Sequence, residues 1–288
     1  MATDNHRKGL VLAAGAALVF SPAAVFVRLA GSLTVWEITC LRLLIAGMAM
    51  AIAALFTKTP LLPEKKERAQ LALFAFVTAV HFSTFTAALE RTSIAHSLAL
   101  TYTAPVFAAL LARFFIKEEL AGKQWLGIFL VVLSVGWLCF GYSTSDSALV
   151  GDGLALVSGL SLGIYHVIGR SAGRRIPLFR YAFWLYFGAG LYLIPLAWPF
   201  ASAYSSKAII ALFLQGAFCT GVGHTLTNAA LRYTSAAYVS LIVTQEVTGG
   251  IFVGALALAE YPSKETIGAL IPLIFGLALV LGRIKRDQ

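Results

Sequence analysis

Charged side chains are scarce in this sequence. Of its 288 residues, 12% are Asp, Glu, Lys or Arg, whereas 59% are hydrophobic. Soluble domains usually have about 25% charged and about 45–50% apolar residues. So little charge leaves a soluble fold of this size without a water-facing surface, and the mean hydropathy of +0.83 indicates that lipid is the main solvent. Disordered, collagen-like and nucleic-acid-binding classes are therefore excluded first.

Cysteines and catalytic motifs are also few. Cys40, Cys139 and Cys219 each lie inside an apolar run, and their odd number argues against a disulfide framework or a metal site. The sequence has no HExxH, nucleophile elbow or Walker motif, and no span carries a pair of aspartates. An intramembrane enzyme would need such a nucleophile–base pair or metal cluster. We therefore expect no enzyme activity, no catalytic residues, no metal and no cofactor.

Apolar segments fill almost the whole chain. A membrane-spanning helix takes roughly 20 apolar residues, and the longest polar connection runs only from Thr57 to Ala69. The sequence therefore predicts an all-α polytopic membrane protein with ten transmembrane helices. The predicted spans are 9–30, 34–56, 70–90, 93–116, 121–141, 151–171, 178–199, 208–231, 235–258 and 264–284.

Lys and Arg residues lie mainly between these spans, where they determine topology. With the N-terminus on the inside, 17 of the 22 Lys and Arg residues fall on the inner side and 4 on the outer side, and Arg42 lies within a span. This asymmetry predicts that both termini are cytoplasmic and that the number of spans is even. It also explains the net charge of +9 without a nucleic-acid partner.

The two halves of the sequence resemble each other at an offset of 142 residues. Residues 87–95 read AALERTSIA and residues 229–237 read AALRYTSAA, and Glu118 and Arg28 fall on Glu260 and Arg170. Each half has five spans, so the second half begins on the opposite side of the membrane. We predict two inverted five-helix repeats, 1–146 and 147–288, within one membrane unit. Such repeats are typical of transporters that expose a central site alternately to either side.

These motifs make the chain similar to the drug/metabolite transporter superfamily, in its ten-helix EamA-type branch. The second copy departs from the pattern at Val247, which replaces Pro105. In the first half the matching residues are Ala88-Leu89, Thr92 to Ala95, Pro105 to Leu110, Glu118 to Leu120 and Leu126-Gly127. In the second half they are Ala230-Leu231, Thr234-Ser235, Glu260 and Ile267-Gly268.

Within that superfamily the chain resembles bacterial aromatic amino-acid exporters of the YddG type. This resemblance implies a secondary transporter of the bacterial inner membrane that exports aromatic and other neutral amino acids, as a monomer or weak homodimer in the lipid bilayer. It also implies that the first four helices of each half line a central cavity and that the fifth and tenth lie at the periphery. Exporters of other small metabolites or drugs, and nucleotide-sugar or lipid carriers, are alternatives in the same superfamily.

Polar side chains at membrane depth are expensive and often functional. Thr78, His81 and Phe85 share one helical face, as do Thr220, His224 and Asn228. Such groups either line a solvated cavity or form hydrogen bonds between helices. The substrate-binding candidates are His81, Phe85, Tyr102, Tyr165, Asn228, Tyr238, Gln245 and Glu246.

Two ionisable side chains and two prolines within the spans allow alternative roles. Glu246 either interacts with a substrate ammonium group, exchanging a proton with it, or stays neutral and bonds a neighbouring helix. Arg42 either attracts a carboxylate or caps a cluster of carbonyls. Pro22 and Pro105 are expected to kink their helices, and a hinge role during transport is a further hypothesis for both.

Overall fold

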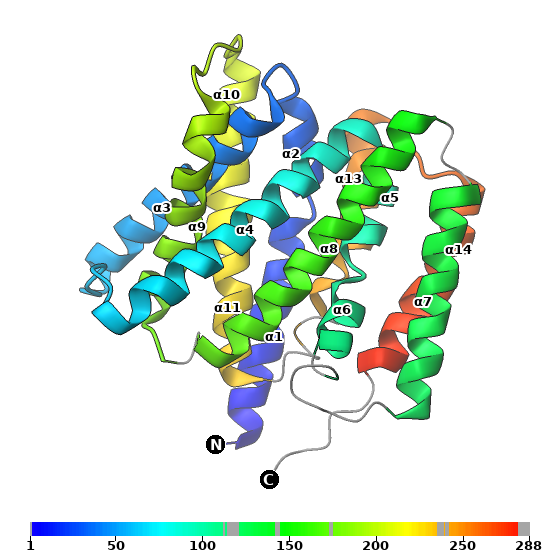
Figure 1. Cartoon of the computed structure of the whole chain (residues 1–288), viewed down its shortest axis with the longest axis horizontal. Coiled ribbons are helices and arrows are strands. Elements are labelled where there is room, and N and C mark those ends of the chain that lie inside the picture. The colour runs from blue at the N-terminus through cyan, green and yellow to red at the C-terminus, as the bar shows by residue number, and fades with distance from the viewer. Residues whose placement is uncertain are drawn as a thin grey trace.

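The computed structural model describes residues 2–111, 113, 121–141, 145–172, 175–234, 239 and 242–281. Within these residues every regular element is a helix (Figure 1). The first half contains α1 (Ala2–Phe20), α2 (Ala23–Leu29), α3 (Val35–Phe56), α4 (Lys65–Arg91), α5 (Ile94–Thr101), α6 (Ala104–Leu111) and α7 (Gly122–Gly141). The second contains α8 (Asp146–Ala172), α9 (Leu178–Ala197), α10 (Ser206–Phe213), the π-helix η2 (Leu214–Gly223), α11 (His224–Tyr233), α13 (Glu246–Leu258) and α14 (Lys264–Leu281).

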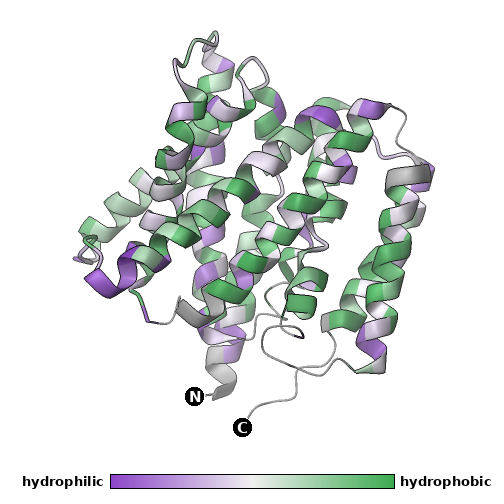
Figure 2. Cartoon of the chain, in the orientation of Figure 1, coloured by the Kyte–Doolittle hydropathy of each residue, from purple (hydrophilic) through white to green (hydrophobic). Residues whose placement is uncertain are grey.

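The ten predicted spans are confirmed, because each of them contains described helix. Six segments are long and apolar enough to cross a membrane by themselves. In Figure 2 the strongly hydrophilic residues gather mainly near the helix ends, as expected for a bundle in lipid. Two helices begin five residues before the predicted spans, at Lys65 and Asp146. Their first turns are polar, so hydropathy alone does not find them. The predicted boundary between the halves, 146/147, lies in the first turn of α8.

The Thr-Ser pair of the repeat ends one helix and starts the next. Thr92 follows α4 and Thr234 follows α11, and both have an extended backbone with ψ of 174°. Ser93 then caps α5, because its hydroxyl accepts a hydrogen bond from the backbone N–H of His96 at 3.1 Å. A serine in this position satisfies one of the free donors of a helix start. The motif that relates the two halves therefore marks the equivalent turn in each.

Helices from the two halves pack in equivalent pairs. Helix α3 packs against α9, α7 against α14, and α5 against α13, and each of these pairs joins matching spans of the two repeats. The contact of α4 with α8 corresponds in the same way to that of α11 with α1. This pairing is what an inverted repeat requires, and it confirms the predicted fold class. The pair α7 and α14 lies at the edge of the bundle (Figure 1).

Three spans are broken inside the membrane. Ser21 and Pro22 separate α1 from α2, and Tyr102 and Thr103 separate α5 from α6, next to Pro105. A proline removes a helical hydrogen bond, which explains both breaks. The third break, at Thr244-Gln245 before α13, falls at the repeat offset of 142 from the second. The two equivalent spans therefore break at the same place, although only the first has a proline there. Hinge motion at Pro22 and Pro105 stays a prediction.

Helices α7 and α14 approach each other through two glycines. A Cβ atom on Gly127 would lie 2.5 Å from the carbonyl oxygen of Gly276, and one on Gly276 would lie 2.8 Å from the carbonyl oxygen of Gly127. Both distances are shorter than a van der Waals contact allows. Small residues of this kind let helix backbones pack closely in a membrane.

Gly127→Leu should therefore force α7 and α14 apart and lower the melting temperature of the detergent-solubilised protein, since overpacking typically costs about 1–3 kcal/mol. Gly136→Leu is the matched control, because a side chain on Gly136 in the same helix meets open space. Size-exclusion chromatography after heating measures both variants. Equal melting temperatures for the two would show that the close packing contributes nothing to stability.

Candidate functional site

A small cavity lies at the centre of the bundle, between the two halves. Its volume is about 40 Å³. A cavity needs about 10–15 Å³ of such volume to hold one water molecule, so this one holds a few waters and no larger molecule. The lining residues are Phe20, Ala23, Arg42, His81, Phe82, Phe85, Thr101, Tyr102, Leu162, His166, Gln215, Cys219, Thr220, His224, Thr227, Val243 and Glu246.

The breaks of the two equivalent spans meet at this cavity. Tyr102 lies in the break between α5 and α6, and Glu246 is the first residue of α13, directly after the break at Thr244-Gln245. The Tyr102 hydroxyl donates a hydrogen bond to the Glu246 carboxylate, and both side chains are buried. Glu246 thus lines the cavity and accepts a hydrogen bond from a neighbouring helical segment, and its interaction with substrate stays a prediction.

Arg42 on α3 is fully buried at the same cavity. Its Nη2 donates to the backbone carbonyl of Phe82 at 3.2 Å, and its guanidinium lies 4.5 Å from the centre of the Phe82 ring. The side-chain oxygen of Gln215 accepts from Nη1 at 2.8 Å in the amide orientation that satisfies both of its groups. The Nε atom has no partner among the described residues. Arg42 therefore caps a carbonyl and has one buried donor, Nε, that makes no hydrogen bond to the described residues.

A basic and an acidic side chain face the cavity from the two halves and form no ion pair with each other in the described part of the chain. These side chains are Arg42 and Glu246. Helix α3 belongs to the first repeat and α13 to the second. A ligand that carries an anionic and a cationic group could therefore interact with both halves at once.

Aromatic and imidazole rings form the apolar part of the site around His224. The ring of Phe20 lies 4.6 Å from that of His224, the ring of Phe82 lies 5.0 Å away, and the ring of His81 lies 6.4 Å away. Rings at such separations pack favourably beyond the area that they bury. The site thus combines flat apolar surfaces with two charges.

Four of the predicted substrate-binding residues lie at the cavity and two lie directly behind it. His81, Phe85, Tyr102 and Glu246 line it. His81 is also bound to α8, since its Nδ1 lies 2.9 Å from the Ser158 hydroxyl.

Tyr165 and Asn228 are not among the lining residues. The Asn228 amide donates to the Tyr165 hydroxyl at 2.8 Å, so this pair joins α8 to α11 and supports the site from behind.

The last two predicted binding residues are not brought to the cavity by the described structure. Gln245 precedes α13, and its side chain is exposed and is not among the residues that line the cavity. Tyr238 lies outside the described residues.

Sequence reasoning also missed several lining residues. His166 lines the cavity with an Nδ1 atom that has no partner in the described part of the chain. Gln215 reaches Arg42 from η2, a π-helix whose register differs from that of an α-helix. An α-helical wheel cannot place Gln215 correctly, whereas the isolated polar character of His166 within an apolar span was a usable signal. Within the described residues no group of His, Cys, Asp and Glu could hold a metal ion.

Comparisons with known proteins agree with this architecture. The chain matches the EamA-like transporter family twice, over residues 7–140 and 149–282. The uncharacterized protein PA1977 of Pseudomonas aeruginosa is 27% identical over 98% of both chains. The uncharacterized transporter YdfC of Bacillus subtilis is 32% identical over 44% of this chain and 41% of its own length. Human solute carrier family 35 member G1 is 22% identical over 92% of this chain and 76% of its own.

A solved structure titled "Crystal structure of protein" has the same fold. It superimposes with a TM-score of 0.71 over 94% of this chain and 95% of that chain, at 16% identity. The family matches confirm the resemblance to the drug/metabolite transporter superfamily and cover each half of the chain separately. The chain belongs to the EamA-like transporter family and is an integral membrane transporter with two EamA domains, not an enzyme.

Proposed function

We propose that this transporter exports amino acids, aromatic and other neutral ones, from the bacterial cytoplasm by alternating access through the central cavity. The observation that supports this substrate class is the unpaired arrangement of Arg42 and Glu246 in one cavity. An α-amino acid carries a carboxylate and an ammonium group on the same carbon. Its carboxylate would bind the free Nε donor of Arg42, and its ammonium group would bind Glu246.

The rings beside these two charges would hold the substrate side chain. Phe20, Phe82 and Phe85 line the same cavity, and an aromatic or aliphatic side chain would pack against them. The alternative substrates fit less well. A nucleotide sugar would favour several cations for its phosphates, whereas Arg42 is the only Lys or Arg among the described lining residues.

Opening of the bundle has to precede substrate binding, because about 40 Å³ does not accommodate an amino acid. The hydrogen bond from Tyr102 to Glu246 joins the breaks of α5 and α13. A substrate ammonium group or a proton that competes for Glu246 would weaken this link between the halves. Ligands shift a conformational equilibrium only through such differential interactions.

The distribution of Lys and Arg supports the proposed orientation. The N-terminal ends of α1 and α4 and the C-terminal ends of α3 and α8 lie on the lower side of the bundle in Figure 1, and Lys8, Lys65, Lys58 and Arg175 lie at or near these ends in the sequence. We propose that this side faces the cytoplasm and that both termini lie there. A monomer or weak homodimer suffices, because both halves of the site belong to one chain.

Glu246→Gln should reduce amino-acid flux at least about tenfold, because the substitution removes the negative charge that would bind the ammonium group. Flux is measured in proteoliposomes with radiolabelled phenylalanine, with and without a pH gradient. Glu90→Gln is the control, since Glu90 is exposed at the far end of α4. Near-normal flux in Glu246→Gln would refute the role of this carboxylate, and no flux of any amino acid through the unmodified protein would refute the substrate class.

Removing the Arg42 charge and removing the Glu246 charge, each in its own variant, should change ligand selectivity in opposite directions. In Arg42→Gln, phenylalanine should compete about tenfold more weakly for uptake, which corresponds to about 1.4 kcal/mol. Phenethylamine lacks the carboxylate, so its competition should be nearly unchanged in this variant. In Glu246→Gln, competition by phenylpropionate should be nearly unchanged, because this compound lacks the amino group. Competition for labelled-substrate uptake measures these ratios.

Arg42→Lys is the companion variant, because it keeps the charge while losing the planar donor group; it should retain more of the preference for phenylalanine than Arg42→Gln. Parallel losses for all three ligands in both charge-removing variants would contradict the assignment of the two charges to two substrate groups.

A further inference from the structure

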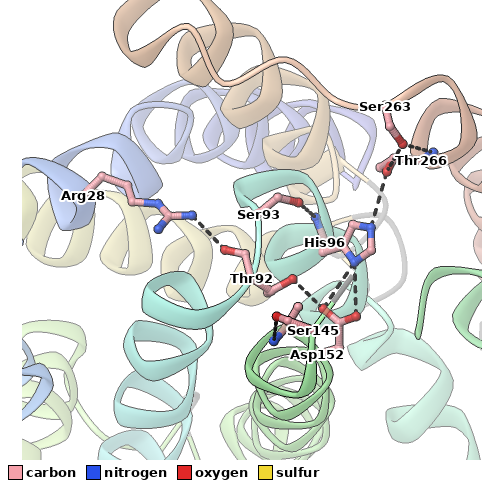
Figure 3. A network of polar contacts seen from close by, with 9 residues as sticks. Arg28, Thr92, Ser93, His96, Ser145, Asp152, Ser263 and Thr266 are labelled. Atoms are coloured by element: carbon pink, nitrogen blue, oxygen red, sulfur yellow. Dashed lines mark hydrogen bonds and ion pairs between the residues drawn. The ribbon is translucent and has the colours of Figure 1, made fainter. Parts of the chain in front are cut away.

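A second cluster of polar side chains joins the two halves at the end of the bundle opposite the N-terminus. Figure 3 shows Arg28, Thr92, His96, Asp152 and Thr266 of this cluster pointing toward one another from several elements. The first half contributes α2, α4 and α5, and the second contributes α8, α14 and the connection between α13 and α14. The residues involved are Arg28, Thr92, Ile94, His96, Asp152, Glu260 and Thr266.

Asp152 on α8 is the buried centre of this cluster. Its side chain is 0% exposed. Its Oδ2 lies 3.1 Å from Nδ1 of His96, and its Oδ1 accepts a hydrogen bond from the Thr92 hydroxyl at 2.7 Å. The other ring nitrogen of His96 lies 3.3 Å from the hydroxyl of Thr266 on α14. A buried carboxylate is tolerated only with such partners, and removing one of them is strongly destabilising.

Arg28 and Glu260 form the second part of the cluster. Nη2 of Arg28 donates to the Thr92 carbonyl at 2.7 Å and lies 3.5 Å from Oε1 of Glu260. The same carboxylate oxygen accepts from the backbone N–H of Ile94 at 2.5 Å. Glu260 therefore binds the start of α5 from the other half. The sequence repeat relates Arg28 to Arg170 and Glu260 to Glu118. Glu118 and the side chain of Arg170 lie outside the described part of the chain.

The cluster stands between the cavity and one face of the protein. His96 precedes the cavity residue Tyr102 by six residues, which is about 9 Å along a helix. Arg28 follows Ala23, which also lines the cavity, by five residues on α2. The ion pairs Arg28–Glu260 and His96–Asp152 connect the two halves, as do the hydrogen bonds Thr92–Asp152, Ile94–Glu260 and His96–Thr266. Movement of the halves apart at this end has to break them together.

We propose that this cluster is the extracytoplasmic gate of the transporter and that Asp152 and Glu260 are its gating residues. The proposal rests on the proposed alternating access and orientation. While the contacts hold, the cavity is sealed on the extracytoplasmic side. When the halves rock apart, water replaces the lost partners of Asp152 and Glu260, and the cavity opens outward. Weakening the cluster should therefore favour the outward-open form.

Cys219 provides a built-in reporter for this gate, because its side chain lines the cavity. The experiment uses the full chain with Cys40 and Cys139 replaced by Ser. A membrane-impermeant trimethylammonium methanethiosulfonate is applied from the outside to right-side-out vesicles. Asp152→Asn and Glu260→Gln should each increase the labelling rate of Cys219 at least about fivefold, which corresponds to about 1 kcal/mol, because each substitution weakens contacts that hold the closed form together. Glu90→Gln, which alters an exposed acid at the same end, should not change the rate.

Labelling from the other side separates gating from loss of fold. In inside-out vesicles the same two variants should label more slowly than the parent, whereas a misfolded protein would label faster from both sides. Thr266→Val, which removes the hydroxyl that contacts His96 and Ser263, should have a smaller effect in the same direction. Unchanged labelling from both sides in Asp152→Asn and Glu260→Gln would overturn the proposal. This test uses no substrate, so an absence of amino-acid flux would refute the substrate class and leave the gate standing.

Discussion

A charged side chain inside a bilayer is costly unless polar groups surround it. Arg42 and Glu246 meet this constraint with groups from several helices: the Phe82 carbonyl, Gln215 and Tyr102. Gln215 lies on the π-helix η2 and Tyr102 lies in the break between α5 and α6, whereas Phe82 lies inside the unbroken helix α4. The breaks at Tyr102 and at Thr244-Gln245, the π-helix η2 and the cavity itself all gather around the two charges. The arrangement maintains a polar site in the centre of an otherwise apolar bundle.

The inverted repeat places this site where equivalent helices of the two halves meet. Equivalent helices pack in pairs across the centre. Arg42 therefore comes from the first half and Glu246 from the second, and the hydrogen bond from Tyr102 to Glu246 joins the two halves. Nearer one face, Asp152 and Glu260 are held by partners from the first half. The Tyr102–Glu246 bond is thus a link between the halves at the cavity, and the contacts of Asp152 and Glu260 are a second set of links nearer one face. In our account, substrate or a proton acts on the first, and the second closes the path to the exterior.

Much of the fold follows from the sequence, because a helix in lipid needs a long apolar segment and an inverted repeat leaves a constant offset. The prominence of Arg42 and Glu246 follows from the same reasoning. The break at Thr244-Gln245 was not predicted, since no proline marks it and the backbone there is set by packing. Gln215 was missed because η2 changes the helical register. Asp152 was missed because its burial depends on His96 and Thr92 from the other repeat. Gln245 was included because the sequence does not show whether a polar residue beside Glu246 faces the cavity.

A structure of the transporter with phenylalanine bound tests the central claim most directly. The account predicts that the substrate lies between the halves, with its carboxylate within hydrogen-bonding distance of Nε of Arg42 and its ammonium group beside Glu246. The link from Tyr102 to Glu246 would then be broken or lengthened. A bound amino acid elsewhere in the bundle, or a direct ion pair between Arg42 and Glu246 with substrate present, would contradict the account.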